Sequence, residues 1–314
     1  MPYDREIVVE LGEEKVRFGY SDQMLPMDAI SVREESALYH QSQATRADFE
    51  PSVLHFWERV LNGSFFFATQ KKCVTVIASP FLSDAFIYAS SCVLFRDFSV
   101  EQVRFQQNCV LPLLPLGTTS GLVIDMDFKT TCIYAVGFGV VDLIHSVTIP
   151  RGVQTMENTA NTLAGEHLFP SPHHTVTSLA SLQDGDSDVC ITCNGKQYEF
   201  NADQRRSIAS SLIEGMPSVP YSICTCLMSV PGDILDAVLA HVIVIGDGRY
   251  VCDVAPHLTH AVKEMVTSSD KFARLRPCME KWAGIVEVRE NERWRGYCVA
   301  ESLQLLDKAI QEVK

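Results

Sequence analysis

The sequence IVVELGEEKVRFGY, from Ile7 to Tyr20, contains the pattern that decides the fold. It begins with an apolar run, passes through Glu10 to a charged turn at Glu13 and Glu14, and then alternates apolar and polar residues. Alternation with a period of two beside a short polar turn is typical of a β-hairpin. We therefore expect a hairpin whose first strand ends in the carboxylate of Glu10.

A second stretch, GLVIDMDFKTTCIYAV from Gly121 to Val136, repeats this order. An apolar strand ends in the carboxylate of Asp125, a short turn follows, and an alternating second strand begins near Thr131. Self-similarity between two segments this far apart indicates two related supersecondary units. The sequence therefore predicts an α/β fold with two related lobes.

Helical and strand patterns alternate along the rest of the chain. Apolar residues at helical spacing, with Pro51 in the expected first turn, predict a helix over 51–62. The polar stretch 28–48 is expected to be mostly loop. Further helices are expected over 83–95, 150–167, 234–239, 255–266 and 300–313, and strands over 73–78, 100–105, 189–193, 197–200 and 242–245.

The composition is that of an ordinary globular protein. Hydrophobic residues make up 46% of the 314 residues and charged residues 21%, which excludes a disordered or collagen-like chain. Lys and Arg number 26 against 39 Asp and Glu, and the net charge of -13 disfavours nucleic acid and anionic membranes as partners. The most apolar window, 109–127, is interrupted by proline and glycine and predicts no membrane span. Without a secretory signal, the eleven cysteines are expected to be reduced thiols in the cytosol or nucleus.

Shorter segments accompany the two hairpin stretches in an order similar to that of a known superfamily. They are LGTTSG (116–121), IPRG (149–152), HVIVIGDGRY (241–250) and KWAG (281–284). Together with the hairpins, they resemble actin and the related sugar kinases and heat-shock chaperones, in which paired hairpins grip ATP. The resemblance implies a duplicated, ribonuclease-H-like, actin-like two-lobed α/β fold. It also implies a first lobe over 1–120, a second lobe over 121–277 and a C-terminal segment, 278–314, that returns to the first lobe.

The residues at the first phosphate-binding position of that family have changed. Where actins have Asp-x-Gly-Ser-Gly, this chain has ELGEE, with Glu10, Gly12, Glu13 and Glu14. A carboxylate about 4 Å from a phosphate charge costs roughly 4 kcal/mol at an effective dielectric near 20, before screening. Two basic residues in the following KVR segment would offset part of that cost.

The other two nucleotide loops have changed in the same direction. The second loop, expected as Asp-x-Gly-x-Gly, reads DMDFK, so Asp125 and Asp127 remain without the glycines that let backbone amides approach phosphate. The third loop keeps Gly246 but has Asp247 in place of a second glycine. Asn108, or its neighbour Gln107, stands where actins position the hydrolytic water. We therefore expect vestigial loops, no ATP hydrolysis and no bound cofactor, with ATP or ADP disfavoured.

Two regions are shorter than their counterparts in actin. The region 27–62, which corresponds to subdomain 2, is compressed, and 153–189 is expected to hold only a remnant of subdomain 4. In actin these regions form the pointed end of the subunit. A subunit without them would dock on a filament and offer no surface for the next subunit. The profile is most similar to the divergent pointed-end actin-related proteins of dynactin, especially their short fungal forms.

The resemblance also implies a function. We expect a non-enzymatic structural subunit that caps or anchors the pointed end of an actin-like filament in a dynactin-type complex, supporting microtubule-motor (dynein) transport in the cytoplasm, associated with the cytoskeleton. Its partners would be actin-like filament subunits and other pointed-end dynactin subunits, with no nucleic acid and no membrane. The groove that receives the neighbour in actins would be lined by Leu114, Gly117, Thr119, Gly139 and Val140. The apolar tract 110–117 is equally well explained as ordinary core.

Two alternatives remain open at this point. A divergent ATPase or sugar kinase of the same superfamily would require that the altered loops still bind nucleotide. An actin-related subunit of a chromatin-remodelling or axonemal complex would share the fold and differ in its partners.

Three further patterns are expected to hold no metal. The CITC segment (190–193) lacks a second cysteine pair at ligand spacing and is interpreted as part of a hairpin. The HLTH segment (257–260) is interpreted as a histidine pair on a helix surface. The DGDSD segment (184–188) lacks the following glycine and glutamate of a calcium-binding loop.

Overall fold

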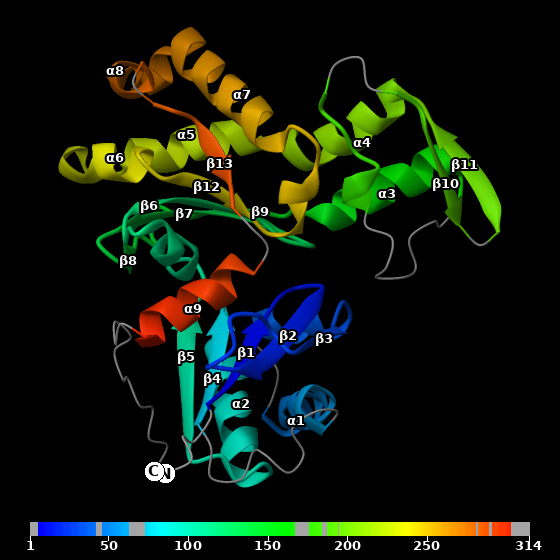
Figure 1. Cartoon of the computed structure of the whole chain (residues 1–314), viewed down its shortest axis with the longest axis vertical. Helices are drawn as coiled ribbons and strands as arrows, with labels where there is room; N and C mark the ends of the chain where they lie inside the picture. The colour runs from blue at the N-terminus through cyan, green and yellow to red at the C-terminus, as the bar shows by residue number, and fades with distance from the viewer. Residues whose placement is uncertain are drawn as a thin grey trace. The chain divides into compact units, whose positions relative to one another are not determined.

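The computed structural model describes residues 6–41, 46–62, 73–166, 176–183, 187–193, 195–280, 282–288 and 291–302 (Figure 1). The chain divides into two compact units. Unit 1 consists of Met1–Gly117 and Arg289–Lys314, and unit 2 is the single stretch Thr118–Val288. Each unit is a mixed α/β structure built on its own sheet.

Unit 1 contains a five-stranded mixed sheet in the order β3-β2-β1-β4-β5. The pairs β1–β2 and β2–β3 are antiparallel, whereas β1–β4 and β4–β5 are parallel. Its strands are β1 (Ile7–Leu11), β2 (Lys15–Tyr20), β3 (Asp28–Ser31), β4 (Cys73–Ala78) and β5 (Gln102–Gln107). Its helices are η1 (Glu35–His40), α1 (Arg46–Asn62), α2 (Asp84–Arg96), η2 (Leu111–Leu116) and α9 (Glu292–Ser302), where η marks a 3-10 helix.

Successive side chains of β1 point to opposite faces of this sheet, and both faces are covered. Ile7 and Val9 belong to a core cluster that also contains residues of α1 and α2. Val8, on the other face, belongs to a second cluster with Trp294 and Tyr297 of α9. Full burial of an aliphatic side chain contributes about 1.5–3 kcal/mol. The helix α9, although distant in sequence, therefore completes the core of unit 1.

Unit 2 contains a six-stranded mixed sheet in the order β13-β12-β6-β7-β8, with β9 also paired to β7. Its strands are β6 (Gly121–Met126), β7 (Thr131–Gly137), β8 (Val140–Val141), β9 (Val147–Ile149), β12 (Val242–Ile245) and β13 (Ile285–Glu287). A separate two-stranded sheet consists of β10 (Val189–Cys193) and β11 (Lys196–Phe200). The helices are α3 (Val153–Ala164), η3 (Val176–Ser178), α4 (Ala202–Ile213), α5 (Val219–Ser229), α6 (Gly232–Leu239), η4 (Asp247–Tyr250), α7 (Val254–Ser268), η5 (Asp270–Leu275) and α8 (Arg276–Met279).

The two sheets share one topology. In unit 2, β6 pairs antiparallel with β7 and β7 with β9, while β6 pairs parallel with β12 and β12 with β13. Strands β6, β7, β9, β12 and β13 thus occupy the places that β1 to β5 occupy in unit 1. The duplication inferred from two sequence segments therefore extends to five strands of each sheet. It places Glu10 of β1 and Asp125 of β6 at corresponding positions.

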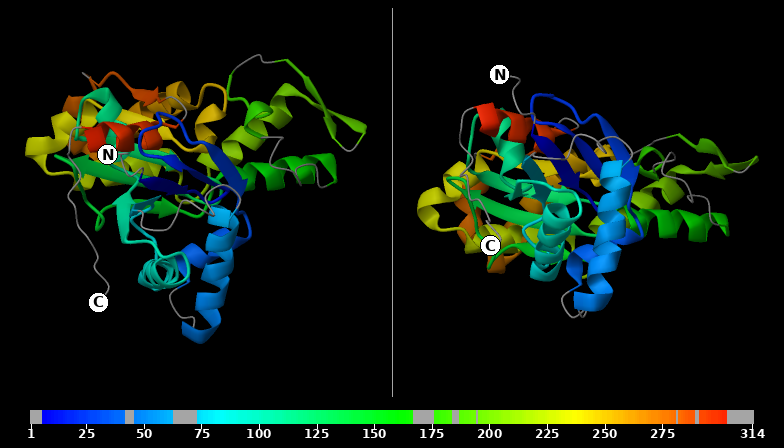
Figure 2. Two further views of the ribbon diagram at one scale, coloured as in Figure 1. Left: turned by 60° about the horizontal axis from the view of Figure 1, so that its bottom comes forward. Right: turned by 90° about the horizontal axis from the view of Figure 1, so that it is seen from below.

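Beyond its main sheet, unit 2 contains a layer made of α3, α4 and the β10–β11 hairpin. Figures 1 and 2 show that the hairpin projects from the end of the two helices, away from the main sheet of this unit. The sequence predicted both strands of this hairpin, but not α4, which follows it directly. Within the region 153–189 itself, the described residues form α3 and η3, and β10 begins at its last residue.

Most predicted elements are confirmed, and the differences have local causes. Both hairpins, over 7–20 and 121–136, form as expected. The expectation of loop over 28–48 is wrong, because this region contains β3 and η1, and α1 already begins at Arg46. Pro51 therefore lies inside α1 and not in its first turn.

Four α-helices among the described residues were not predicted, namely α4, α5, α8 and α9. The helix expected over 300–313 falls almost entirely outside the described residues. The segment 278–314, expected to return to the first lobe, includes β13, which pairs with β12 in unit 2. Among the helices that the structure describes, none is long and apolar enough to cross a membrane.

Candidate functional site

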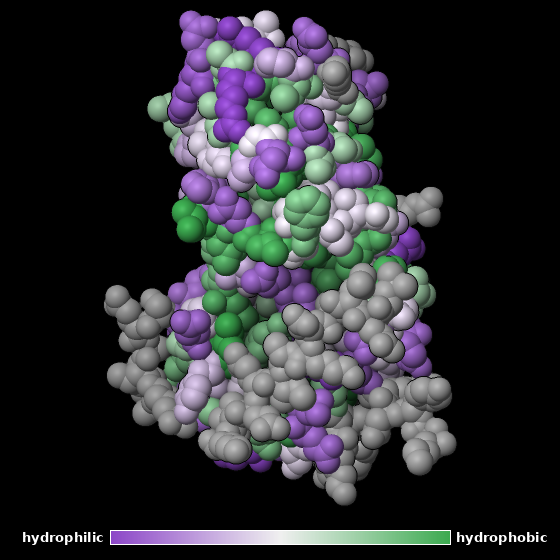
Figure 3. Space-filling model, turned by 90° about the vertical axis from the view of Figure 1, so that its left-hand side faces the viewer, coloured by the Kyte–Doolittle hydropathy of each residue, from purple (hydrophilic) through white to green (hydrophobic). Residues whose placement is uncertain are grey.

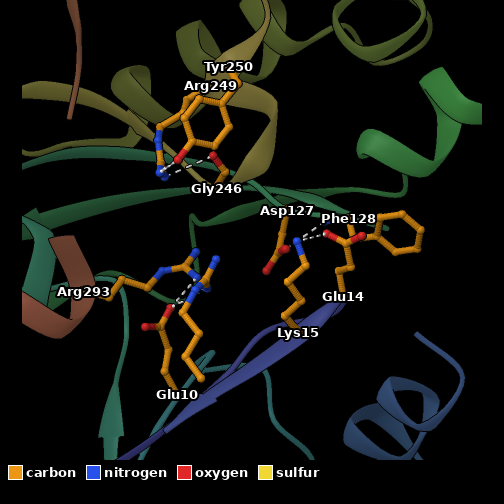
Figure 4. A network of polar contacts seen from close by, with 10 residues as sticks. Glu10, Glu14, Lys15, Asp127, Phe128, Gly246, Arg249, Tyr250 and Arg293 are labelled. Atoms are coloured by element: carbon orange, nitrogen blue, oxygen red, sulfur yellow. Dashed lines mark hydrogen bonds and ion pairs between the residues drawn. The ribbon is translucent and has the colours of Figure 1, made fainter. Parts of the chain in front are cut away.

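Glu10 lies buried at the carboxyl end of β1. Its Oε1 accepts hydrogen bonds from Nη1 of Arg17, at 3.3 Å, and from Nη1 of Arg293, at 3.4 Å (Figure 4). Arg17 is the cross-strand partner of Glu10 in β2, and Arg293 comes from α9. A buried carboxylate is tolerated when paired cations offset the cost of removing it from water. This acid is therefore neutralised by its own unit.

Glu14 ends the β1–β2 turn and is also buried. Its carboxylate accepts a hydrogen bond from Nε of Arg33 at 3.1 Å and lies 3.5 Å from Nζ of Lys15. The backbone carbonyl of Glu14 accepts the N–H of Val32 at 2.8 Å. Glu14 thus fastens the turn to the segment that follows β3. Its side chain has a structural role that the sequence did not indicate.

The rest of the first turn is short and closed on itself. The N–H of Gly12 donates to the carbonyl of Lys15 at 3.1 Å, and Glu13 is half-buried. The two basic residues of the KVR segment lie beside these acids, since Arg17 pairs with Glu10 and Lys15 with Glu14. The turn therefore has cationic partners for its acids before any ligand is considered.

The turn between β6 and β7 is closed by backbone contacts. The carbonyl oxygens of Asp127 and Phe128 accept the N–H groups of Val153, at 3.1 Å, and Gln154, at 2.8 Å. These N–H groups lie at the N-terminus of α3, where a helix otherwise binds anions. A Cβ at Gly152 would lie within 3.0 Å of both carbonyl oxygens, so glycine permits this approach. The α3 N-terminus is therefore occupied by the chain's own carbonyl groups.

Asp125 and Gly246 lie at the same edge of the unit 2 sheet, because Asp125 of β6 pairs with Ile245 of β12. Gly246 has a φ of 82°, in the left-handed region. A Cβ there would lie within 3.0 Å of the carbonyl oxygen of Met126 and 2.9 Å from Oδ1 of Asp125. Gly246 is therefore required by contact with the adjacent strand of its own unit.

The cross-strand neighbour of Asp125 in β7 has a thiol side chain. Asp125 pairs with Cys132 of β7, and both residues are buried. Burial, together with the nearby charge of Asp125, raises the pKa of the Cys132 thiol to about 11. The acid at the end of β6 therefore has surroundings that differ from those of Glu10.

The third loop forms η4 directly after Gly246. Asp247 is half-buried there. The guanidinium of Arg249 lies 4.3 Å from the ring centroid of Tyr250, and its Nη1 donates to the carbonyl of Gly246 at 3.3 Å (Figure 4). Arg249, the cation nearest in sequence to this loop, thus contacts residues of the loop.

The five residues expected to line a groove fall in both units. Leu114 and Gly117 belong to unit 1, where Leu114 packs against the cluster that contains Trp294, and Gly117 ends η2 with a φ of 74°. The first half of the 110–117 tract is core, whereas its end is exposed. Thr119 and Gly139 belong to unit 2 and are joined by a hydrogen bond of 2.7 Å from the Gly139 N–H to the Thr119 carbonyl.

Gly139 and Val140 belong to an exposed segment, 137–147, that we call the apolar hairpin. Phe138, Val140 and Ile144 are 73%, 71% and 88% exposed. Phe138 and Gly139 both have positive φ and form the two-residue turn between β7 and β8, and the Phe138 N–H donates to Oγ of Ser120 at 2.8 Å. Figure 3 looks onto the side on which β8 lies, and apolar side chains are visible there. Exposed apolar side chains that gather in one place mark interaction surfaces.

Two buried acceptors lie near the carboxyl edge of the unit 1 sheet. Asn108 follows β5 and donates its backbone N–H to the carbonyl of Ala78 at 2.9 Å. Within the described residues, neither Oδ1 of Asn108 nor Oε2 of Glu10 accepts a hydrogen bond. Gln107, the other residue considered for this role, is exposed. These two acceptors keep a hydrogen-bonding capacity that the described residues do not use.

The patterns weighed for metal binding do not form a site in the described part of the chain. No group of three or more His, Cys, Asp or Glu side chains is arranged there to hold a metal ion. Cys190 is exposed on β10, and the side chain of Cys193 lies outside the described residues, as does 184–186. His260 lies on the surface of α7, 4.0 Å from the carboxylate of Glu264.

Two residues of the site were missed by sequence reasoning. Arg33 is separated from Glu14 by 19 residues, and Arg293 is separated from Glu10 by 283. No local pattern connects either pair. The only available signal was that a buried strand-end carboxylate requires a partner, without any indication of which arginine supplies it.

No model of a protein family matches this chain, and no curated protein matches its sequence.

Proposed function

We propose that this chain is a non-enzymatic, actin-related structural subunit that caps or anchors the pointed end of an actin-like filament in a dynactin-type complex. The observation that carries the proposal is the pairing of Glu10 with Arg17 and Arg293 at the turn where the superfamily binds phosphate. The carboxylates at this turn are held in ion pairs with cations of the chain itself, so those cations are already engaged without a nucleotide.

The fold supports the proposal at a coarser level. Duplicated mixed sheets with the same strand order are what a two-lobed actin-like protein requires. Topology alone does not select a function, because one fold supports many activities. The assignment to a filament-associated complex therefore comes from the sequence resemblance, and the topology is compatible with it.

The three loops support a subunit without ATPase activity. The first turn is fastened by Glu14 and Arg33, the second by backbone contacts at Gly152, and the third by the contact of Gly246 with β6. Each loop is thus held by groups of its own unit. Structural turns of this kind remain stable without a nucleotide.

The apolar hairpin supports the proposed role in assembly. Its turn is fixed by two hydrogen bonds that backbone N–H groups donate, from Phe138 to Oγ of Ser120 and from Gly139 to the carbonyl of Thr119. A rigid apolar surface loses little conformational entropy when it is covered by a partner. We assign the docking of a filament subunit to this hairpin.

The proposed termination of a filament rests mainly on the short segment between β2 and α1. That segment contains only β3 and η1 as regular elements among its described residues. The second shortened region, 153–189, contains α3 and η3 among its described residues, and β10, β11 and α4 follow it.

A second candidate function is a subunit that retains nucleotide without hydrolysing it. The observation that favours it is the pair of buried acceptors, Oε2 of Glu10 and Oδ1 of Asn108, that accept no hydrogen bond from the described residues. A hydrated cation that accompanies a nucleotide would satisfy such acceptors. This candidate shares the structural role and differs in its ligand.

Titration with Mg²⁺ and ATP tests the absence of an ATPase. We expect no heat of binding up to about 1 mM ATP in calorimetry and no release of phosphate. Micromolar binding with turnover would contradict the proposal, and micromolar binding without turnover would replace it with the second candidate.

Native purification of the tagged chain from cells tests the assembly role. We expect actin-like filament subunits and pointed-end subunits of a dynactin-type complex to copurify with it. The variant Phe138→Ser/Ile144→Ser should lose the filament subunits, whereas the control Met216→Ser should keep them. Met216 is 99% exposed in the same unit and lies outside the apolar hairpin. Recovery without such subunits, or with those of a chromatin or axonemal complex, would contradict the assignment.

A further inference from the structure

A second exposed apolar surface lies in unit 1, in the connection between β2 and β3. Met24, Leu25 and Met27 are 58%, 52% and 44% exposed, so three large apolar side chains face solvent within four residues. Asp22 and Asp28, at the two ends of this segment, are exposed as well. We call residues 22–28 the methionine loop. Its apolar centre is thus bounded on both sides by negative charge.

The backbone of the methionine loop is fixed to the core of unit 1. The carbonyl of Gln23 accepts Nε1–H of Trp294 at 2.7 Å and the thiol of Cys298 at 3.2 Å, and both donors belong to α9. The side-chain Oε1 of Gln23 accepts the N–H of Tyr20 at 3.2 Å. The loop is therefore held at its beginning by a buried tryptophan and a strand.

The end of the loop is held in the same way. The N–H of Met27 donates to the carbonyl of Phe18 at 2.8 Å. A Cβ at Gly19 would lie 3.0 Å from the Met27 nitrogen and 3.1 Å from both Gln23 Oε1 and Trp294 Cζ2. The loop and the strand are thus packed backbone against backbone. The side chains of the methionine loop are therefore exposed although its backbone is held in place by hydrogen bonds and close packing.

A fixed loop that presents apolar side chains to water favours a binding surface. Burial of each side chain is favourable, and a fixed loop loses little entropy on binding. Methionine adapts its shape to different partners, so two methionines in one small patch suit a helix surface. The flanking carboxylates of Asp22 and Asp28 then select for basic residues beside the apolar ones.

Addition of a strand to the neighbouring edge is a less suitable mode. The edge strand β3 is short, from Asp28 to Ser31, and the carbonyl of Ser31 accepts Nη2–H of Arg59 at 3.0 Å. An arginine that caps the edge in this way opposes a further β-ladder. An amphipathic helix needs no backbone hydrogen bonds from its receptor.

We propose that the methionine loop binds an amphipathic basic helix of a partner protein, with its apolar stripe on Met24, Leu25 and Met27 and its lysine or arginine residues beside Asp22 and Asp28. This surface is separate from the apolar hairpin of unit 2. The inference goes beyond the proposed function and does not depend on it. It assigns a second class of partner to unit 1, which also contains the β1–β2 turn.

Fluorescence anisotropy with a designed probe tests this surface. The probe is a labelled helical peptide of about 18 residues, with leucines at helical spacing and lysines elsewhere. We expect saturable binding to the full chain at micromolar concentration. The variant Met24→Ser/Leu25→Ser/Met27→Ser should bind about tenfold more weakly, with an unchanged melting temperature, because all three side chains are exposed.

Two controls separate this surface from general attraction to an acidic protein. The variant Phe138→Ser/Ile144→Ser alters exposed apolar residues of unit 2 and should bind the peptide as the unmodified chain does. A peptide with glutamate in place of lysine should bind at least about tenfold more weakly. Equal binding by the triple serine variant would overturn the proposal. So would equal binding of the glutamate peptide, or an equal loss in the Phe138 and Ile144 variant.

The flanking charges provide an independent measurement. The variant Asp22→Asn/Asp28→Asn should weaken binding of the lysine peptide by roughly three- to tenfold at low salt, and by less at high salt, where charges are screened. An unchanged affinity at low salt would overturn the assignment of a basic partner. These outcomes do not involve ATP or copurification, so they are distinguishable from those of the proposed function.

Discussion

The β1–β2 hairpin of unit 1 and the β6–β7 hairpin of unit 2 occupy the same place in two sheets of the same topology. Each has a buried acid at the end of its first strand, Glu10 in one and Asp125 in the other. Glu10 faces Arg17 across the ladder and is also paired with Arg293, whereas Asp125 faces Cys132. The same backbone position therefore has two different electrostatic environments.

This difference shows how the two turns are stabilised. The first turn depends on charged side chains, since Arg17, Arg293 and Arg33 neutralise its acids. The second depends on close backbone approach, which only the glycines at 152 and 246 allow. The stability of unit 1 should therefore fall when one of these cations is removed, and the stability of unit 2 should fall when a methyl group is added at one of these glycines.

The largest effect is expected for Gly246→Ala in unit 2. An alanine here would adopt a left-handed backbone, at about 1–2 kcal/mol, and its Cβ would contact Met126 within 3.0 Å, at about 1–3 kcal/mol. We expect a loss of roughly 3 kcal/mol or more in the free energy of unfolding, measured with urea. Gly139→Ala is the matched control, because Gly139 has a φ of 80° and no neighbour within 4 Å of its Cβ position. Similar losses in both variants would show that the contact with β6 contributes nothing.

A smaller effect is expected for Arg293→Met in unit 1. It leaves Arg17 as the ion-pair partner of the buried Glu10, at 3.3 Å. The loss in the free energy of unfolding should therefore be smaller than the roughly 3–5 kcal/mol of a buried charge left without compensation. The double variant Glu10→Gln/Arg293→Met should recover part of this loss, because the buried charge is then removed together with its partner. Urea unfolding of the two single variants and the double variant measures the coupling. Additive losses would contradict a direct Glu10–Arg293 interaction.

The smallest effect concerns Cys132, the partner of Asp125. The folded thiol keeps its proton up to about pH 11, whereas an ordinary thiol loses it near 9.0. The contribution of this thiol to stability is therefore complete below pH 9 and is lost as the pH rises toward 11. Asp125→Asn should lower the pKa of Cys132, but burial, the larger cause, should keep it above 9.0. Iodoacetamide labelling of the native chain against pH, followed by peptide mass spectrometry, measures this pKa; an unchanged value would contradict the influence of Asp125.

The hairpins were predictable because their information is local. Alternation of apolar and polar residues over 7–20 and 121–136 determines strands, turn and the strand-end acids together. The strand order of each sheet was not predictable in the same way. It depends on parallel pairing of β1 with β4 and of β6 with β12, which are far apart in the sequence.

Two of the helices that were missed, α9 and α5, do not show the expected one-sided apolar pattern. In α9, the charged residues Glu292 and Arg293 are buried together with Trp294. In α5, buried side chains occur around most of the helix, so a polar face is nearly absent. The expected start of α1 was wrong because a proline preference for the first turn was applied to Pro51, which the helix accommodates further along.

The acidic residues of the candidate site were predicted from the sequence, whereas two of the arginines that pair with them were not. Glu10, Glu14 and Asp125 were identified from their places at strand ends and turns. Arg33 and Arg293 reach the first turn only through the tertiary fold, and their pairing gives the acids a structural role. The position of a buried acid can be predicted from a local sequence pattern. The cation that pairs with it can come from a distant part of the chain, and no local pattern identifies it.

The division of the chain has a consequence for its synthesis. Unit 2 is one continuous stretch, whereas α9 is added to unit 1 only after Val288. During translation, the sheet of unit 1 emerges before α9. Until α9 leaves the ribosome, the face that contains Val8 has only Leu111 and Leu114 of η2 from its cluster to cover it, and Glu10 has no Arg293. Domains generally fold as units while they are being synthesised. The first unit to be made is therefore the last to be completed.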